Sequence, residues 1–221
     1  PMLRMRFSSN AKKIKKARLY ATARGIYELY LNGKRVSEEF FNPGLTQYNK
    51  SHSYQTFDIT NSLKSGSFNV IGAMLGEGWW SGNITYGGEN WNYFGDRQSL
   101  LTKMVITYED NSQQTIVSDD KNWKLFTDGP IRCGSFFQGE VYDAGKEAKI
   151  TNWSLATYSD KAWKKAVEVP LSGTTFDDKK VLNFDQCQLI GELGDKITRI
   201  KTLTAQKMME VRPKVFVYDM G

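Results

Sequence analysis

The sequence is poor in histidine and cysteine. Its one histidine, His52, stands in the polar stretch "NKSHSYQ", where we expect a surface position. A single histidine argues against a histidine-based catalytic triad and against a metal site built from several histidines. The two cysteines, Cys133 and Cys187, form no Cys-x-x-Cys pattern. We therefore expect free thiols rather than a zinc site or a disulfide framework.

The sequence also lacks long apolar runs. No segment approaches the roughly 20 apolar residues that a membrane-spanning helix needs, and the first residues, "PMLRMRFSSN", have no apolar signal region. We therefore expect a soluble piece, mature or excised from a longer protein, with no membrane partner. With 221 residues and a hydrophobic fraction of 40%, the chain is long enough to bury a real core, as one substantial domain with part of another or as two small domains.

The charge balance is basic, with a formal net charge of +6. Nucleic acid is therefore a partner to consider. Much of the excess lies in "KKIKKAR" (Lys12 to Arg18), where four lysines flank Ile14 and lead straight into a strand pattern. A solvated strand edge or turn is favoured over a polyanion site there, so no nucleic-acid partner is expected.

Short alternating or apolar runs, separated by turn residues about every ten positions, dominate the sequence. This spacing predicts an antiparallel all-β fold. "ARLYATA" (Ala17 to Ala23) alternates, and "IYELYLNGKRV" (Ile26 to Val36) contains Asn32-Gly33, a strong hairpin signal. Further strands are predicted at 54–60, 68–75, 99–109 and 114–119.

Helical patterns are few, and only Ser154 to Val169 has plausible helical spacing, enough for one or two turns. A β-sandwich with Greek-key or jelly-roll connections is the expected architecture. We expect the sandwich module to span residues 1–169. Residues 170–195, which begin with the polar run "PLSGTTFDDKK", would form a linker or crossing segment. Residues 196–221, with strands at 196–203 and 214–219, would be the start of a following β-sandwich module.

Several motifs suggest chemistry and then fail to support it. Glu140 and Asp143 in "GEVYDAG" could act as paired carboxylates. Residues three apart on a strand point to opposite faces, however, so a strand end and turn is favoured. The glycine-rich "GEGWWSG" lacks the lysine of a phosphate-binding loop and opens no helix. The ion pair suggested by Asp96-Arg97 could be functional or structural.

Aromatic residues are concentrated in one glycine-rich stretch. Six fall within sixteen residues: Trp79, Trp80, Tyr86, Trp91, Tyr93 and Phe94. Aromatic rings next to polar groups suit sugars, which have apolar C–H faces and polar edges. The same rings could instead plug the end of the sandwich core.

The order of these motifs resembles a known family. "ARLYATARGIYELYLNGKRVSEEFFNPGLTQYNKSHSYQTFDITNSLKSGSFNVIGAMLGEGWWSG", followed by "YFGDR", "WKLFTDGPIRCGSFFQGEVYDAG" and "VFVYDMG", resembles the N-terminal module of bacterial α-L-rhamnosidases of glycoside hydrolase family 78. The resemblance covers nearly the whole chain. It implies a galactose-binding-like, jelly-roll sandwich.

The resemblance also implies a place in a larger enzyme. In that family, β-sandwich modules precede an (α/α)6 barrel that carries the general acid and base. This chain has no barrel, so we expect the parent protein to be the rhamnosidase and the fragment to be inactive, with no catalytic residues of its own. Rhamnosidases that act on polymers are often exported, which suggests a periplasmic or extracellular bacterial location for the parent enzyme.

Related modules bind terminal L-rhamnose with a calcium ion on the sugar hydroxyls. The family pattern of glycine, acid, glycine, tryptophan and aromatic puts forward Trp79 and Trp80, of which one would brace the loop and the other would face a sugar. At "NPGLTQYNKS" the family more often has tryptophan and aspartate, which weakens a calcium site near Asn49; Asn49 and Asp96 are the metal-ligand candidates. The candidate carbohydrate-binding residues are Trp79, Trp80, Asn83, Tyr86, Asp96, Arg97, Glu140, Tyr142 and Asp143.

The function that follows is a non-catalytic module that binds or positions rhamnose-containing glycans. The alternative is a scaffold that packs against the catalytic barrel without binding sugar itself. An autonomous enzyme using Glu140 and Asp143 is the third hypothesis. Polyanion binding through Lys12 to Arg18 is the fourth.

Overall fold

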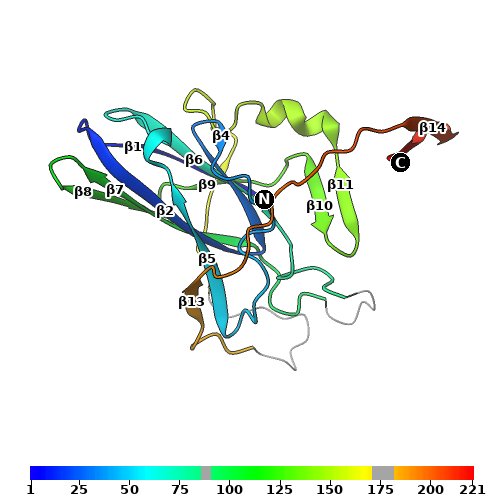
Figure 1. Ribbon diagram of the computed structural model, residues 1–221, viewed down its shortest axis with the longest axis horizontal. Helices are drawn as coiled ribbons and strands as arrows, with labels where there is room; N and C mark the ends of the chain where they lie inside the picture. The colour runs from blue at the N-terminus through cyan, green and yellow to red at the C-terminus, as the bar shows by residue number, and fades with distance from the viewer. Residues whose placement is uncertain (86–90, 171–181) are drawn as a thin grey trace.

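Two sheets pack face to face in the computed structural model, which describes residues 1–85, 91–170 and 182–221 (Figure 1). The first sheet contains, in spatial order, β12 (Lys164–Lys165), β9 (Lys124–Phe126), β1 (Met2–Ser8), β6 (Phe68–Gly76), β3 (Ile26–Leu31) and β4 (Lys34–Arg35). The second contains β13 (Gln188–Gly191), β5 (Ser51–Asp58), β2 (Ile14–Arg24), β7 (Ser99–Tyr108) and β8 (Gln113–Val117). Neighbouring strands are antiparallel except β13, which runs parallel to β5. The expectation of an all-β, jelly-roll type sandwich is confirmed.

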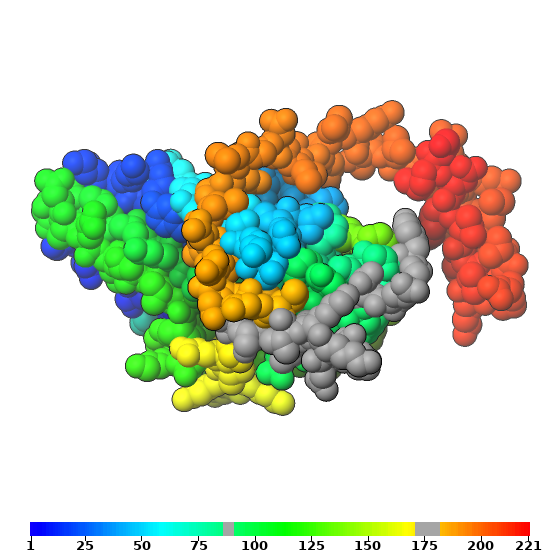
Figure 2. Space-filling view, turned by 90° about the horizontal axis from the view of Figure 1, so that it is seen from below, coloured from blue at the N-terminus to red at the C-terminus, as the bar shows by residue number. Residues whose placement is uncertain are grey.

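Two hairpins and two short 3₁₀ helices lie outside the sheets. The hairpins are β10 (Ile131–Ser135) with β11 (Gly139–Tyr142), and β14 (Lys207–Arg212) with β15 (Val215–Asp219). The helices are η1 (Thr60–Ser62) and η2 (Ala144–Ile150). Figure 1 shows β10–β11 beside the sandwich, and Figure 2 shows β14–β15 standing apart from it.

The core between the sheets follows from strand alternation. On β2, Ala17, Leu19, Ala21 and Ala23 are buried and lie two residues apart, as period-two alternation requires. These small side chains leave room for larger groups from the facing sheet and neighbouring strands. The members of this cluster include Met5, Phe7, Tyr27, Leu29, Leu31, Phe57, Ile71, Leu75, Met104, Ile106 and Trp123.

A second apolar cluster covers the outer face of the first sheet. Trp153 and Trp163 stack there with ring centroids 6.0 Å apart, and Trp153 contacts Tyr30 at 5.2 Å. Arg4, whose side chain is 1% exposed, pairs with Asp160 from the same covering segment. The segment after η2 is thereby fixed to the sheet.

The strong strand patterns were read correctly. The strands predicted at 54–60, 68–75, 99–109 and 114–119 correspond to β5, β6, β7 and β8. The predicted hairpin forms between β3 and β4, and its turn residues Asn32 and Gly33 have φ of 51° and 90°. Positive φ at both positions is what the Asn-Gly pair supplies in such turns. The strand predicted at 214–219 appears as β15.

The helix expected within Ser154 to Val169 was wrong. This segment contains turns and the short strand β12, whereas η2 lies earlier in the chain. Two contacts explain the difference. Trp163 is held in the outer cluster, and the N–H of Ala166 donates to the carbonyl of Trp123 at 3.0 Å, which extends the pairing of β12 with β9.

The strand expected at 196–203 was also wrong. Residues 192–199 instead form an extended strap along the sandwich. Its contacts are few: the N–H of Phe40 donates to the carbonyl of Ile197 at 2.9 Å, and Lys196 pairs with Glu39. β13, within the expected linker, joins the second sheet just before this strap. The N–H of Glu192 still donates to the carbonyl of Tyr54 at 3.1 Å, but beyond it one backbone hydrogen bond is too little for a ladder, so the segment stays extended without becoming a strand.

The lysine run is solvated and paired. Lys12 contacts Asp110 at 2.7 Å and Lys13 lies 3.6 Å from Glu109, on the turn between β7 and β8. These exposed pairs place opposite charge beside the run. In the described residues, no helix is long and apolar enough to span a membrane.

Candidate functional site

The two adjacent tryptophans lie on the loop that follows β6, which we call the tryptophan loop (77–85 and 91–97 in the described chain). The loop turns back on itself: the N–H of Trp80 donates to the carbonyl of Glu77 at 3.1 Å. The N–H of Gly82 then donates to Asn92 Oδ1 at 2.7 Å, and the N–H of Asn92 returns a bond to the Gly82 carbonyl. These bonds tie the two ends of the loop together.

Trp80 is the anchor of this loop. It is 1% exposed and packs against Tyr48, Phe94 and Phe184, with ring centroids 5.6–6.2 Å away. A Cβ on Gly95 would lie 2.6 Å from the Trp80 ring, so only glycine fits there. Trp80 thus plugs the end of the sandwich and cannot offer a face to a ligand.

His52 belongs to the same cluster, which corrects the expected surface position. It is 6% exposed, stacks on Tyr48 at 4.9 Å and lies 5.8 Å from the Trp80 ring. Burial, helped by the charge of Arg24, lowers the pKa of His52 to about 4. The ring is neutral at pH 7 and serves as a packing group. Its polar sequence neighbours gave no sign of this, because adjacent strand residues face opposite sides.

Trp79 packs against the outside of the same cluster. It is half-buried and stacks on Phe136 with centroids 4.3 Å apart and a 30° interplanar angle. Phe136 in turn contacts Phe41 at 5.1 Å, and these two phenylalanines are 38% and 40% exposed. We call these three side chains the aromatic row. They form a surface of the kind that the C–H face of a sugar ring packs on.

Sequence reasoning missed two of the three members of the aromatic row. Phe136 lies in the turn of the β10–β11 hairpin, in the sequence "GSFFQG". Two adjacent phenylalanines at an exposed turn were the available signal. The pairing of Gly134 with Glu140 and of Ser135 with Gly139 places Glu140 next to this turn. The structure therefore brings Trp79 and Glu140, 61 positions apart in the sequence, to the same hairpin.

The other predicted hairpin residues are exposed and have local partners. The hydroxyl of Tyr142 donates to Glu147 Oε1 at 2.6 Å, and this bond raises the pKa of Tyr142. Asp143 accepts the N–H of Gly145 at 3.0 Å and caps η2. Asp143 thus has a structural task, which argues against pairing it with Glu140 for catalysis.

The remaining candidates lie on the tryptophan loop. Asn83 is 9% exposed, and its Oδ1 accepts the N–H of Thr85 at 3.3 Å. Asp96 and Arg97 are exposed, and Arg97 Nε lies 3.5 Å from Asp96 Oδ1. Tyr86 lies outside the described residues.

The two calcium candidates have no acidic cluster around them in the described residues. The ion takes six to eight oxygen ligands. No group of three or more histidine, cysteine, aspartate or glutamate side chains within the described ranges could hold a metal ion. Of the two candidates, Asn49 offers one buried amide oxygen that accepts no hydrogen bond from a described residue, and Asp96 is engaged by Arg97. Cys133 and Cys187 are free thiols, as expected.

Comparison with known proteins identifies relatives over nearly the whole chain. The profile of the α-L-rhamnosidase N-terminal domain matches residues 12–186. An α-L-rhamnosidase of Streptomyces avermitilis is 35% identical over 219 residues, which cover 99% of this chain and 19% of the relative. One of Formosa agariphila is 38% identical over 160 residues, 72% of this chain and 16% of the relative.

Solved structures agree with these matches. The crystal structure of the Streptomyces avermitilis α-L-rhamnosidase complexed with L-rhamnose superposes with a TM-score of 0.82 at 32% identity, covering 99% of this chain and 19% of that one. The α-L-rhamnosidase of Dictyoglumus thermophilum gives a TM-score of 0.76 at 34% identity, covering 99% of this chain and 22% of that one. The chain thus spans about a fifth of the length of these relatives.

Proposed function

Because this chain belongs to the family of α-L-rhamnosidase N-terminal domains, we propose that it is a non-catalytic module of a larger α-L-rhamnosidase that binds or positions rhamnose-containing glycans. The single observation that carries the binding role is the aromatic row beside Glu140. Glycoside hydrolysis itself would take place elsewhere in the longer protein.

The aromatic row offers the two kinds of contact that a sugar needs. Trp79, Phe136 and Phe41 supply an apolar surface, and Trp80 holds the loop that carries Trp79. Glu140 is exposed next to the same turn and can accept hydrogen bonds from sugar hydroxyls. No metal step is needed for this mode of binding.

Isothermal titration with L-rhamnose, in calcium and then in chelator, tests the proposal. We expect calcium-independent binding that Trp79→Ala abolishes and Glu140→Gln weakens. Phe68→Ala is the matched control, because Phe68 is a half-exposed aromatic at the opposite end of β6. Absence of binding to L-rhamnose and to rhamnosyl glycans in every condition would refute the binding role.

A scaffold role is the second candidate, and exposed apolar side chains favour it. Ile131, Val141 and Tyr142 on the β10–β11 hairpin are 44%, 58% and 49% exposed. The β14–β15 hairpin exposes apolar groups on both faces, as shown by Met208 opposite Tyr218 and Met209 opposite Val217. Two-stranded hairpins are marginal alone. We propose that β14–β15 begins a following sandwich module.

The two roles differ in a measurable way. Hydrogen exchange of Val141 and Tyr142 in this chain, compared with the full-length protein, reports whether the hairpin is covered by other domains. Strong extra protection together with an absence of rhamnose binding would favour the scaffold. Unchanged exchange together with rhamnose binding would favour the sugar-binding module.

A further inference from the structure

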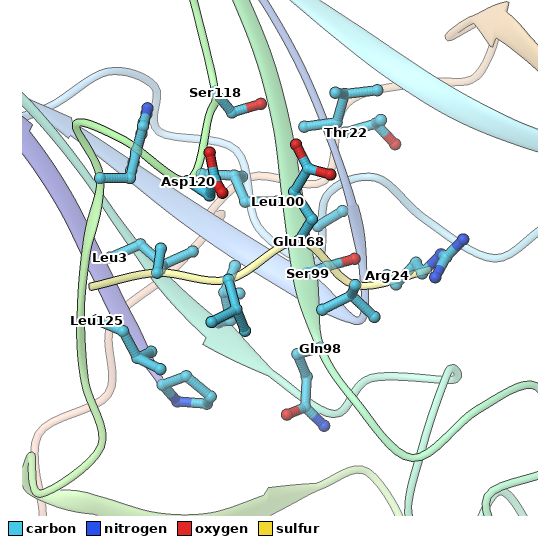
Figure 3. Close-up of a pocket in the computed structure, with 18 of the residues that line it drawn as sticks. Leu3, Thr22, Arg24, Gln98, Ser99, Leu100, Ser118, Asp120, Leu125 and Glu168 are labelled. Carbon is cyan, nitrogen blue, oxygen red and sulfur yellow. The ribbon is translucent and has the colours of Figure 1, made fainter. Parts of the chain in front are cut away.

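An open cavity of about 490 Å³ lies at the edge of the sandwich (Figure 3). We call it the edge cavity. It is bounded by the end of β2, the start of β7, β9 and the segment 166–169. Its volume lies within the range of small-molecule sites, about 300–1,000 Å³.

One side of the edge cavity is apolar. Leu3 and Leu125 come from the first sheet, Leu100 from the second, and Trp123 precedes β9. Leu3 and Leu100 pack against the central core, of which Trp123 is a member. The cavity therefore continues the apolar interior to the surface, where a methyl group or a C–H face can pack against the leucines.

The other side carries two carboxylates with no partner. In the part of the chain that the structure describes, neither Asp120 nor Glu168 makes a hydrogen bond or an ion pair. Asp119, by contrast, is occupied: its Oδ1 accepts the N–H groups of Lys121 at 3.0 Å and Asn122 at 2.7 Å. Figure 3 shows both unused carboxylates beside Ser118, with Leu3 and Leu125 across the cavity.

Pairing between strands explains why both carboxylates line one cavity. β12 pairs with β9, and the N–H of Ala166 donates to the carbonyl of Trp123. Glu168 follows Ala166 by two residues, and Asp120 precedes Trp123 by three. This pairing returns the segment that carries Glu168 to the neighbourhood of the turn that carries Asp120, although the two residues are 48 positions apart in the sequence.

The charges around the cavity select the class of ligand. Two carboxylates repel an anion, and they accept hydrogen bonds from hydroxyl groups readily. The one arginine of the lining, Arg24, lies at the opposite end, where its guanidinium packs over Trp80 at 5.2 Å and donates to the Pro170 carbonyl. A neutral ligand with neighbouring hydroxyls on one side and an apolar group on the other satisfies both sides.

We infer that the edge cavity is a second sugar site, which takes one 6-deoxyhexose residue with its methyl group among the leucines and its hydroxyls donating to Asp120 and Glu168. The choice of rhamnose as that sugar rests on the proposed function. The site itself rests on the cavity and its unused carboxylates. It shares no residue with the aromatic row.

Amide chemical shifts of the ¹⁵N-labelled chain, titrated with L-rhamnose, test the inference. We expect two groups of shifting signals, one around residues 118–125 and 166–169 and one around the aromatic row. Asp120→Asn with Glu168→Gln should weaken binding at the cavity about tenfold, because two charged acceptors are replaced by neutral ones. Glu109→Gln, an exposed carboxylate on the β7–β8 turn, is the matched control and should leave both groups unchanged.

L-mannose, which differs from L-rhamnose only by a hydroxyl on the methyl carbon, tests the apolar side. We expect it to bind the cavity at least about threefold more weakly, since the leucines offer that hydroxyl no partner. Equal binding of the two sugars, no shifts at the cavity, or shifts unaffected by the double variant would overturn the inference.

The experiment tests the two sites independently. Cavity shifts that persist in Trp79→Ala while the other group is lost would support both sites. Shifts at the aromatic row alone would overturn the cavity site and leave the proposed function standing. Shifts at the cavity alone would support the cavity site and refute the aromatic row.

Discussion

The strap after β13 depends on one buried carboxylate. Glu39 has a side chain that is 5% exposed, and it accepts hydrogen bonds from Lys196 of the strap and from Asn42 Nδ2 at 3.1 Å. Burial alone would raise the pKa of Glu39, but these hydrogen bonds outweigh it and lower the pKa. Lys196→Met removes the cation of this contact and roughly keeps the length of the side chain.

The stability that the closed strap should lose in Lys196→Met can be estimated from the burial of the ion pair. Removing one partner of a buried ion pair costs about 3–5 kcal/mol. Lys196 is 64% exposed, so water screens the pair and the cost should be near 2 kcal/mol at pH 7. Protonation of the carboxylate sets a ceiling, because protonating a glutamate of ordinary pKa, about 4.3, at pH 7 costs about 3.7 kcal/mol at 1.36 kcal/mol per pH unit.

Hydrogen exchange measures this cost locally. The N–H of Gln188 donates to the carbonyl of Lys50, the residue before β5, and the N–H of Glu192 donates to the carbonyl of Tyr54 in β5. Opening of the strap exposes both these amides and Glu39. A cost of 2 kcal/mol should lower their protection about thirtyfold in Lys196→Met, while amides between β2 and β7 keep theirs.

The stability lost in Lys196→Met should depend on pH, and the pKa of Glu39 gives the direction of that dependence. In the native protein the lowered pKa of Glu39 stabilises the closed strap above the unfolded pKa, and this is lost as pH falls through the folded pKa. In Lys196→Met, burial dominates and Glu39 takes up a proton more readily, so the deficit should shrink between pH 7 and pH 4. Glu39→Gln with Lys196→Met should recover most of the loss. A loss below about 0.5 kcal/mol at pH 7, or one equal at both pH values, would refute this reasoning.

Three further predictions concern the stability of the sandwich, measured by urea unfolding. Arg4→Met should cost about 2–3 kcal/mol because Arg4 is buried against Asp160, whereas Arg18→Met, at an exposed pair, should cost less than about 1 kcal/mol; equal losses would contradict the assignment. Trp80→Ala should lower the free energy of unfolding by about 3–5 kcal/mol and Trp79→Ala by less than half of that, because Trp80 is the buried ring. The reverse order would show that Trp79, and not Trp80, closes the end of the core. The pKa of His52 is lowered to about 4 in the folded protein, so the free energy of unfolding should fall by up to about 3 kcal/mol as pH drops from 6.5 to 4, because the unfolded chain takes up the proton first. His52→Phe should remove this pH dependence, and an unchanged pH dependence would place its origin elsewhere.

Patterns within one strand could be predicted from the sequence. The alternation of Ala17 to Ala23 identified β2, and Asn32-Gly33 identified the β3–β4 turn, because each signal is contained in a few adjacent residues. β1 carries the same kind of signal, since Leu3, Met5 and Phe7 alternate with polar residues, and it was missed; β13 carries none. β13 is a strand because β5 offers it an open edge, with Leu189 paired to His52. That information resides in another part of the chain.

The candidate site shows the same division. The composition of the tryptophan loop identified an aromatic cluster, but which ring is buried depends on distant partners. Phe184 covers Trp80 from more than a hundred residues away, and Phe136 covers Trp79 from the hairpin. The short-range sequence contains neither contact, so it could name both tryptophans but not separate their tasks.

Two adjacent tryptophans on one loop can serve binding because they are not equivalent. A loop rich in glycine loses much conformational entropy when it is ordered, and a sugar alone would have to supply that free energy. Trp80, buried against Tyr48 and Phe184, supplies it during folding instead. Trp79 packs against the outside of this cluster, and Phe136 stacks on it and limits its rotation. A ring that is already fixed loses little further entropy on binding, so Trp80→Ala should weaken rhamnose binding at the aromatic row even though Trp80 touches no sugar, and Trp80→Phe should restore part of the affinity.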